Sequence, residues 1–190
     1  MGQLDNKVAI ITGAGSNGMG RATAMLFAAE GAKVVVSDIS QDGGEETVRI
    51  IKEAGGEAVF VRADVSRSAD VQRMVNTAVE TYGRLDILFN NAAIFGPPGL
   101  SIADYDEETW DEVINVDLKG VFLGMKYSIP VMINGGGGVI INNASVSGLR
   151  ANPGGGIYGT AKAGVIHLTK VAALEYGAMN IRVNSICPFG

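Results

Sequence analysis

The sequence predicts an α/β protein with a doubly wound parallel sheet, built in three α/β/α layers. Short apolar runs rich in valine and isoleucine recur along the chain, and longer stretches with helical periodicity separate them. The first run, residues 7–11, is typical of a strand that is buried on both faces. Strands that alternate with helices are joined by right-handed crossovers, which place a parallel sheet between two layers of helices.

The same patterns set the order of the elements. The predicted strands are residues 7–11, 33–37, 58–61, 85–89, 138–142 and 181–186. The predicted helices are residues 18–30, 45–54, 67–82, 106–117, 119–132 and 156–176, of which the fourth and fifth are either separate or one bent unit. Glycine favours the position after a helix, so Gly31 and the Gly55-Gly56 pair end the first two helices. The period of the first helix puts four apolar residues on one side, namely Ala22, Met25, Leu26 and Ala29.

Length and composition narrow the class of protein. The chain of 190 residues, with 47% apolar and 18% charged residues, is typical of one packed globular domain over residues 1–190. A net charge of −5 without a Lys/Arg cluster argues against a nucleic-acid partner. The apolar runs are far too short to span a bilayer. The single cysteine, Cys187, cannot form an internal disulfide, so we expect a cytoplasmic location.

A glycine-rich turn, T-G-A-G-S-N-G-M-G at residues 12–20, follows the first strand. In a turn between a strand and a helix, free N–H groups and the helix dipole favour a pyrophosphate, so the turn predicts a Rossmann-like dinucleotide site. Two overlapping patterns fit. Gly13, Gly15 and Gly18 match the general fingerprint, whereas Gly13, Gly18 and Gly20 match a different spacing with one extra residue. Tight turns and close helix packing also require glycine.

Two acids follow the second and third strands. Asp38 can accept hydrogen bonds from an adenosine ribose and would repel a 2′-phosphate, which favours NAD over NADP. Residues 16–17 and 39–40 offer no cation for such a phosphate. Asp64 could meet the adenine amino group, or it could be a turn residue or a helix N-cap.

The segment Asn90-Asn91-Ala92-Ala93 follows the fourth strand. Its small residues let a cofactor lie close to the backbone, and its asparagine amides can bridge neighbouring strand ends. Farther on, a loop with Phe95, Pro97 and Pro98 either borders a substrate pocket or is only rigid.

Tyr158 and Lys162 open the last helix, and their i, i+4 spacing places both side chains on one face. A nearby ammonium stabilises a phenolate, so the pair suits proton transfer to or from an alcohol oxygen while a hydride moves to or from carbon. Ser145, at the end of the fifth strand, could offer its hydroxyl to the same oxygen. Ser147 is the competing serine.

Taken together, these motifs resemble the short-chain dehydrogenase/reductase family over essentially the whole chain. The matching segments are T-G-A-G-S-N-G-M-G, V-V-V-S-D, R-A-D-V, N-N-A-A, I-N-V-D-L-K-G-V-F, N-A-S-V-S-G and Y-G-T-A-K. The resemblance implies that Tyr158 is the catalytic acid/base, that Ser145 polarises the substrate oxygen, and that Lys162 binds the nicotinamide ribose and lowers the tyrosine pKa. It also implies that Asn115 holds a water in a proton relay; the residues alone suggest a buried helix-kink position.

The resemblance also implies a set of cofactor contacts and three departures. The cofactor-binding residues are Gly13, Asn17, Gly18, Met19, Gly20, Asp38, Asp64, Val65, Asn91, Ala92, Tyr158 and Lys162. The family turn is one residue shorter, so Gly13, Gly18 and Gly20 are the expected functional glycines, the Gly15 match is a by-product, and the extra residue lies near Ser16 or Asn17. N-N-A-A replaces N-N-A-G. The family continues past the sixth strand with a substrate-covering segment, a helix and a last strand, so we expect this domain to be C-terminally incomplete.

The predicted function is an NAD-dependent oxidoreductase that interconverts a secondary alcohol and a ketone, with a small or alicyclic substrate. One alternative is an NADPH-dependent 3-oxoacyl-[acyl-carrier-protein] reductase, which would favour cations near the cofactor phosphate. The other is a dinucleotide-binding sensor without turnover. His167 is the only histidine and no ligand cluster accompanies it, so we expect no metal. By family analogy, we expect a homotetramer.

Overall fold

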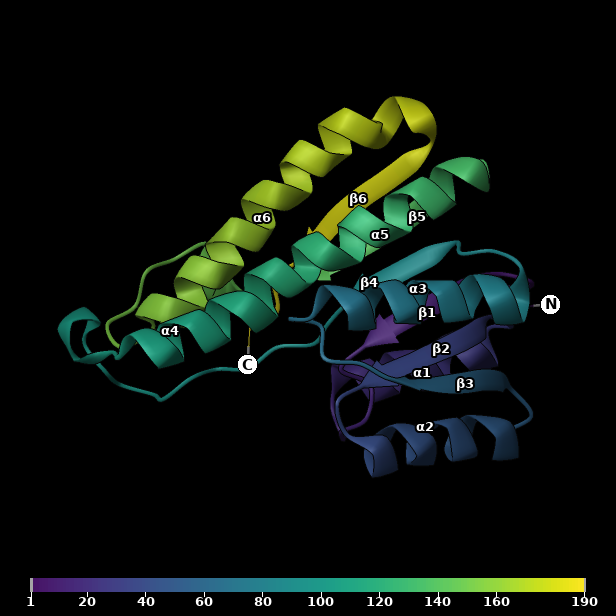
Figure 1. Cartoon of the computed structure of the whole chain (residues 1–190), viewed down its shortest axis with the longest axis horizontal. Helices are drawn as coiled ribbons and strands as arrows, with labels where there is room; N and C mark the ends of the chain where they lie inside the picture. The colour runs from purple at the N-terminus through teal and green to yellow at the C-terminus, as the bar shows by residue number, and fades with distance from the viewer. Residues whose placement is uncertain (1, 190) are drawn as a thin grey trace.

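The computed structural model describes residues 2–189; Met1 and Gly190, the two ends of the predicted domain, lie outside this range. Six parallel strands form one sheet in the order β3-β2-β1-β4-β5-β6 (Figure 1). They are β1 (Val8–Thr12), β2 (Lys33–Asp38), β3 (Glu57–Arg62), β4 (Ile87–Asn90), β5 (Gly138–Asn143) and β6 (Ile181–Ile186). The strand order reverses between β1 and β4, and in such sheets ligands bind outside the carboxyl ends of the strands at this point.

Helices cover both faces of the sheet. The longer helices are α1 (Met19–Ala29), α2 (Gln41–Glu53), α3 (Ser68–Tyr82), α4 (Glu107–Ile114), α5 (Gly120–Asn134) and α6 (Gly156–Tyr176). Neighbouring residues of β1 point to opposite faces: Ile10 belongs to the core beneath α3, α5 and α6, whereas Ile11 belongs to the core beneath α1 and α2. The predicted three-layer, doubly wound α/β fold is therefore confirmed.

The buried face of α1 is not the predicted one. Met25 and Leu26 are 40% and 58% exposed, and the buried residues are Gly20, Ala24 and Ala28. A Cβ atom on Gly20 would lie 2.1 Å from the Gly13 carbonyl oxygen, so the helix lies too close to the turn for a larger residue. Because α1 lies so close to the glycine turn, the side of the helix with the smallest residues is buried, and the most apolar side is not.

Helix α2 begins at Gln41 and not at Glu45, because two glycines that are poor helix formers are needed inside it. A Cβ atom on Gly43 would lie 2.2 Å from the Gly15 carbonyl oxygen, and one on Gly44 would lie 1.9 Å from the Phe60 ring. The Ser40 side chain caps the helix by accepting from the Gly43 N–H at 3.2 Å. These glycines therefore lie inside the helix, where they allow close contact with the glycine turn and with β3, and they do not form a loop.

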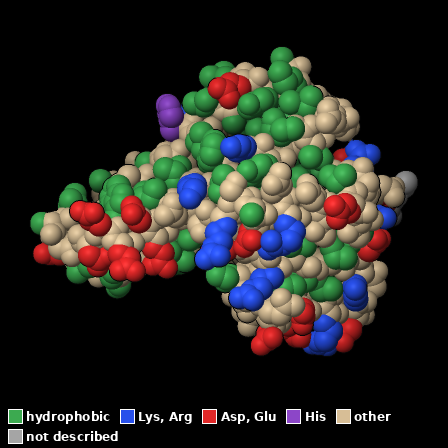
Figure 2. Space-filling view, viewed as in Figure 1, with side chains coloured by type: hydrophobic (Ala, Val, Ile, Leu, Met, Phe, Trp, Pro, Cys, Tyr) green, Lys and Arg blue, Asp and Glu red, His purple; other side chains and the backbone are tan. Residues whose placement is uncertain are grey.

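Helices α4 and α5 are continuous, so of the two predicted alternatives the structure has the single unit. A π-helical segment, Asn115–Lys119, joins them, and such segments are frequent at functional sites. Helix α4 packs on the start of α6 through Val113, Ile157 and Ala161. In Figure 1, α4 projects away from the sheet, and acidic side chains gather at this end of the molecule in Figure 2. Within residues 2–189, no helix is both long and apolar enough to cross a membrane.

Candidate functional site

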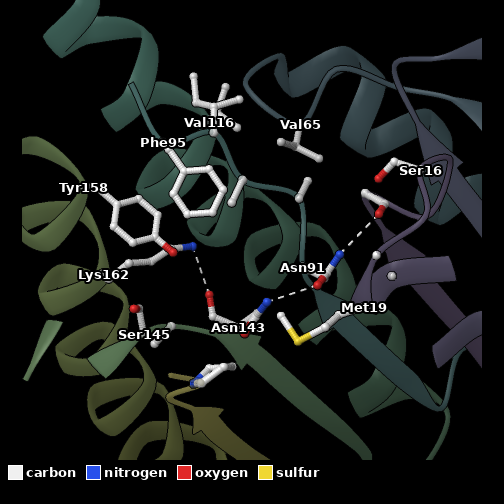
Figure 3. Close-up of a pocket in the computed structure, with 18 of the residues that line it drawn as sticks. Ser16, Met19, Val65, Asn91, Phe95, Val116, Asn143, Ser145, Tyr158 and Lys162 are labelled. Atoms are coloured by element: carbon white, nitrogen blue, oxygen red, sulfur yellow. Dashed lines mark hydrogen bonds between the residues drawn. The ribbon is translucent and has the colours of Figure 1, made fainter. Parts of the chain in front are cut away.

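A cavity of about 1090 Å³ lies at the carboxyl ends of the strands. Every strand of the sheet sends residues to its wall, from the end of the strand or from the segment after it: Gly13, Asp38, Asp64, Asn91, Ser145 and Pro188. Figure 3 shows Tyr158, Lys162 and Ser145 on one side of the cavity and Ser16 and Met19 on the other. All predicted site residues except Asn17 line this cavity.

The glycine turn is built for close approach. Gly13 has a φ of +66°, and a Cβ atom there would lie 2.8 Å from the Ala92 Cα. At Gly18 the nearest atom to a Cβ is the Ser16 Oγ, at 3.8 Å, so space above the start of α1 stays open. Open space beside backbone N–H groups at a helix N-terminus fits a pyrophosphate.

The extra residue of the turn is taken up at Ser16–Gly18. The Gly18 N–H donates to the Ser16 carbonyl oxygen at 2.8 Å, which closes a three-residue turn. Gly15, which we expect to lie outside the functional glycine set, has a structural role of its own. Its N–H donates to the Asp38 Oδ2 at 2.7 Å, and a Cβ atom there would lie 2.7 Å from the Asp38 Cγ. Gly15 is therefore required where the turn meets β2.

Arg21 joins the glycine turn to helix α2 by hydrogen bonds. Its Nη2 donates to the Gly15 carbonyl at 2.6 Å and to the Gly43 carbonyl at 3.1 Å, and its Nε donates to the Thr47 hydroxyl at 2.8 Å. Its Nη1 donates to the Asn17 side chain. Asn17 thus faces Arg21 and not the cavity. The sequence prediction missed Arg21, although its position one helical turn after Asn17 could have indicated the contact.

We predict that Arg21→Ala weakens dinucleotide binding about tenfold, because several charge-assisted hydrogen bonds order the turn. The measurement is the dinucleotide Kd by calorimetry, beside the free energy of unfolding. Arg49→Ala is the matched control, since Arg49 is exposed and its ion pairs within residues 2–189 are with Glu46 and Glu53 of its own helix. An Arg21→Ala variant with an unchanged dinucleotide Kd would show that the glycine turn binds the dinucleotide without the Arg21 hydrogen bonds.

Hydrogen bonds join the strand ends, as the asparagine pair predicted. The Thr12 hydroxyl accepts from the N–H groups of Asn91 and Ala92 at 2.9 and 3.0 Å. The Asn91 Nδ2 donates to the Thr12 carbonyl at 2.9 Å, and the Asn143 Nδ2 donates to the Asn91 Oδ1 at 3.0 Å. The ends of β1, β4 and β5 therefore form one frame under the cavity.

The two predicted acids hold their own turns and also line the cavity. Asp38 accepts from the Gly15 N–H at 2.7 Å and from the Ser40 N–H at 2.9 Å. The Asp64 Oδ1 accepts from the N–H and hydroxyl of Ser66 at 2.9 and 2.6 Å. Because Arg67 occupies the N-cap of α3, Asp64 is a turn residue at the cavity wall and not the helix cap.

The opposite end of the cavity brings Tyr158 and Lys162 together. The Lys162 side chain is only 2% exposed, and its Nζ lies 5.3 Å from the centre of the Tyr158 ring. The same Nζ donates to the Asn143 carbonyl at 3.0 Å and lies 3.1 Å from the Asp117 Oδ2. The Ser145 Oγ accepts from the Ser147 N–H at 3.1 Å, and both serines line the cavity.

Burial raises the pKa of Tyr158 above its ordinary value; the Ser145 hydroxyl opposes this rise and the Asp117 charge adds to it. Burial likewise raises the pKa of Asp117, against the effects of Lys162 and of the Ile94 N–H. The tyrosine therefore loses its proton less readily than an exposed phenol. Its ionisation depends on the charges around it.

The side chains of Asn115 and Asp117 contact different lysines. The Asn115 Oδ1 accepts from Lys119, on its own helical segment, at 3.3 Å, and the residue is half-buried at the kink beside the cavity. Asp117 is fully buried and is the one that contacts Lys162. The sequence prediction missed Asp117, although a carboxylate between Val116 and Leu118 was a visible signal.

Of the loop residues Phe95, Pro97 and Pro98, Phe95 is the one that lines the cavity. Its ring centre lies 4.9 Å from that of Tyr158, with the planes tilted by 34°. The ring is 73% exposed. An exposed aromatic side chain against the candidate acid/base places an apolar surface at the mouth of the site.

Comparison with known proteins now identifies the family. The model of the short chain dehydrogenase family matches residues 7–190. The chain belongs to this family. A cyclohexanol dehydrogenase from Acinetobacter sp. (strain SE19) is 44% identical over 186 residues, covering 98% of this chain and 73% of that protein.

Solved structures agree with this assignment. Levodione reductase superposes with a TM-score of 0.94 at 39% identity, covering 98% of this chain and 72% of that one. NAD⁺-bound xylitol dehydrogenase superposes with a TM-score of 0.94 at 35% identity, covering 98% of this chain and 71% of that one. This short-chain dehydrogenase is therefore an NAD(P)-dependent oxidoreductase that acts on CH–OH groups, with alcohol dehydrogenase-like relatives.

Proposed function

We propose that this short-chain dehydrogenase interconverts secondary alcohols and ketones with NAD. The observation that carries the proposal is the cluster of Tyr158, Lys162 and Ser145 at one end of a cavity whose other end holds Asp38. The first three residues supply proton transfer and polarisation. The last supplies the preference for the cofactor.

The residues fit a nicotinamide dinucleotide. The open space at Gly18 and the close approach at Gly13 suit a pyrophosphate, and Asp38 suits an adenosine ribose with a free 2′-hydroxyl. Residues 39–40 bring no cation to a 2′-phosphate, and Arg21 is occupied by the turn itself. These features support NAD over NADP. A solved relative, xylitol dehydrogenase, is NAD⁺-bound.

In the proposed mechanism, the bound dinucleotide supplies the hydride-transfer chemistry. Tyr158 takes the hydroxyl proton during oxidation and returns it during reduction. Ser145 donates a hydrogen bond to the substrate oxygen, which stabilises charge as it develops there. Lys162 holds the nicotinamide ribose and stabilises the phenolate. Asn115 borders the same space and is proposed to hold a relay water.

The cavity wall near Tyr158 favours an apolar substrate. Besides Phe95, apolar side chains from four segments line it, namely Ile94, Val116, Val146 and Phe189. Such a wall suits a small alicyclic alcohol better than a charged one. The similarity to a cyclohexanol dehydrogenase supports this substrate class. The cytoplasmic location and the homotetramer stay predictions.

The decisive experiment follows the absorbance of the reduced nicotinamide with cyclohexanol, related cyclic alcohols and linear secondary alcohols, with NAD and NADP in parallel. We expect turnover of the cyclic alcohols, faster with NAD. A preference for NADPH and a 3-oxoacyl thioester would favour the acyl-carrier-protein reductase alternative. Dinucleotide binding without any turnover would favour the sensor.

A further inference from the structure

A buried carboxylate lies beside the lysine of the proposed active site. Asp117 has no exposed surface, and its Oδ2 lies 3.1 Å from the Lys162 Nζ. Its Oδ1 accepts from the Ile94 N–H at 2.8 Å. Each carboxylate oxygen thus has its own neighbour, one on the loop after β4 and one on α6.

The Lys162 ammonium is held from two directions. The Asn143 carbonyl at the end of β5 accepts its hydrogen bond at 3.0 Å, and Asp117 approaches from the π-helical segment. A buried charge costs several kcal/mol unless it is paired and hydrogen-bonded. Asp117 is therefore the charge partner of the buried Lys162 side chain.

We propose that Asp117 is a positioning residue, which fixes the Lys162 ammonium beneath Tyr158, offsets its charge and sets the pH range in which the tyrosine exchanges a proton. The proposal rests on the function proposed above. The carboxylate does not itself line the cavity, and its ion pair is with Lys162, so it acts on Tyr158 through the lysine.

The sign of the effect follows from the charges. A cation near a phenol stabilises the phenolate, and an anion beside that cation weakens this effect. Accordingly, the Asp117 charge adds to the rise in the pKa of Tyr158. Without it, the lysine charge acts on the tyrosine alone, and the tyrosine ionises at lower pH.

Other ionisable groups around the pair lie farther along the elements packed on it. From α4 and the π-helical segment they are Glu112 and Lys119, and at the opposite end of the cavity they are Asp38 and Asp64. Neither β5 nor residues 91–95 carry an ionisable side chain, and His167 of α6 lines a separate apolar groove. Among residues 2–189, Asp117 is the one acid in an ion pair with Lys162.

The test is Asp117→Asn, which keeps the shape and an acceptor for the Ile94 N–H but removes the charge. We expect the acidic limb of the pH profile of kcat/KM for alcohol oxidation, where activity falls as Tyr158 becomes protonated, to move about one pH unit to the acid side. Asp111→Asn removes an exposed charge from the same helical unit and is expected to leave the profile in place.

A second readout needs neither cofactor nor turnover. The ultraviolet titration of tyrosinate, taken as the difference between each protein and its Tyr158→Phe derivative, reports Tyr158 alone. We expect its midpoint to fall in Asp117→Asn, and also in Asp117→Ser should the amide variant not fold. An unchanged midpoint would overturn the proposal. A shifted midpoint in a protein that turns over no alcohol would keep the proposal and reject the proposed function.

Discussion

Tyr158→Phe is expected to lower kcat by about 1,000-fold while the dinucleotide Kd stays within about twofold of wild type, since a positioned acid/base contributes 100- to 10,000-fold. The change removes only the hydroxyl that is proposed to exchange the substrate proton. The ring still packs on Phe95, whose centre lies 4.9 Å away, so the cavity keeps its wall. Steady-state kinetics with a cyclic alcohol, beside calorimetry with NAD, measure the two effects separately.

The matched control is Tyr82→Phe. The Tyr82 hydroxyl is buried and has no hydrogen-bond partner among residues 2–189, and Tyr82 packs on the core at the end of α3. Its loss is expected to leave kcat unchanged. If Tyr158→Phe kept full activity as well, another group would be the acid/base and the proposed mechanism would be wrong.

Asp38→Asn is expected to lower kcat/KM with NAD by about 10- to 100-fold, since hydrogen bonds to a charged group contribute about 1.5–3 kcal/mol. The charge that would repel a 2′-phosphate also disappears, so the preference for NAD over NADP should fall further than the activity itself. Competition kinetics with both cofactors measure the preference directly.

Asp38 also accepts hydrogen bonds from the Gly15 and Ser40 N–H groups, so the substitution disturbs the glycine turn as well as the cofactor contact. The free energy of unfolding and the ratio of the two cofactors separate these causes, because a disturbed turn weakens both cofactors alike. Asp42→Asn, in the exposed first turn of α2, is the charge-matched control. An unchanged cofactor ratio in Asp38→Asn would remove the main argument for NAD.

The sheet and its winding could be predicted because burial on both faces leaves a continuous apolar run in the sequence. The period of the hydrophobic residues, however, does not indicate how closely a helix approaches its neighbours. On α1 it selected Met25 and Leu26, whereas the Gly20 backbone lies so close to Gly13 that the small side faces inward. The α2 start was placed too late for the same reason, since Gly43 and Gly44 resemble a loop until their neighbours are known.

The candidate site was predictable where spacing along one element fixes geometry, as for Tyr158 and Lys162. It was not predictable where partners come from distant segments. Asp117 meets Lys162 only because the π-helical segment turns it inward, and Arg21 meets Gly43 only because α2 packs on the turn. Such contacts depend on the packing of whole elements, which no local pattern contains.

The strand-end frame has a consequence for how such an enzyme can diverge. Thr12, Asn91 and Asn143, at or next to the ends of β1, β4 and β5, link the glycine turn to Lys162 by side-chain and carbonyl hydrogen bonds. Phe95, in contrast, lies farther along the loop after β4, beyond the Asn91 and Ala92 N–H groups that the frame holds. Mutations can therefore exchange the surface that meets the alcohol while the proton and hydride machinery stays in register. Substitutions in the loop can therefore change substrate selectivity without changing the catalytic residues, because the two properties depend on different parts of the backbone.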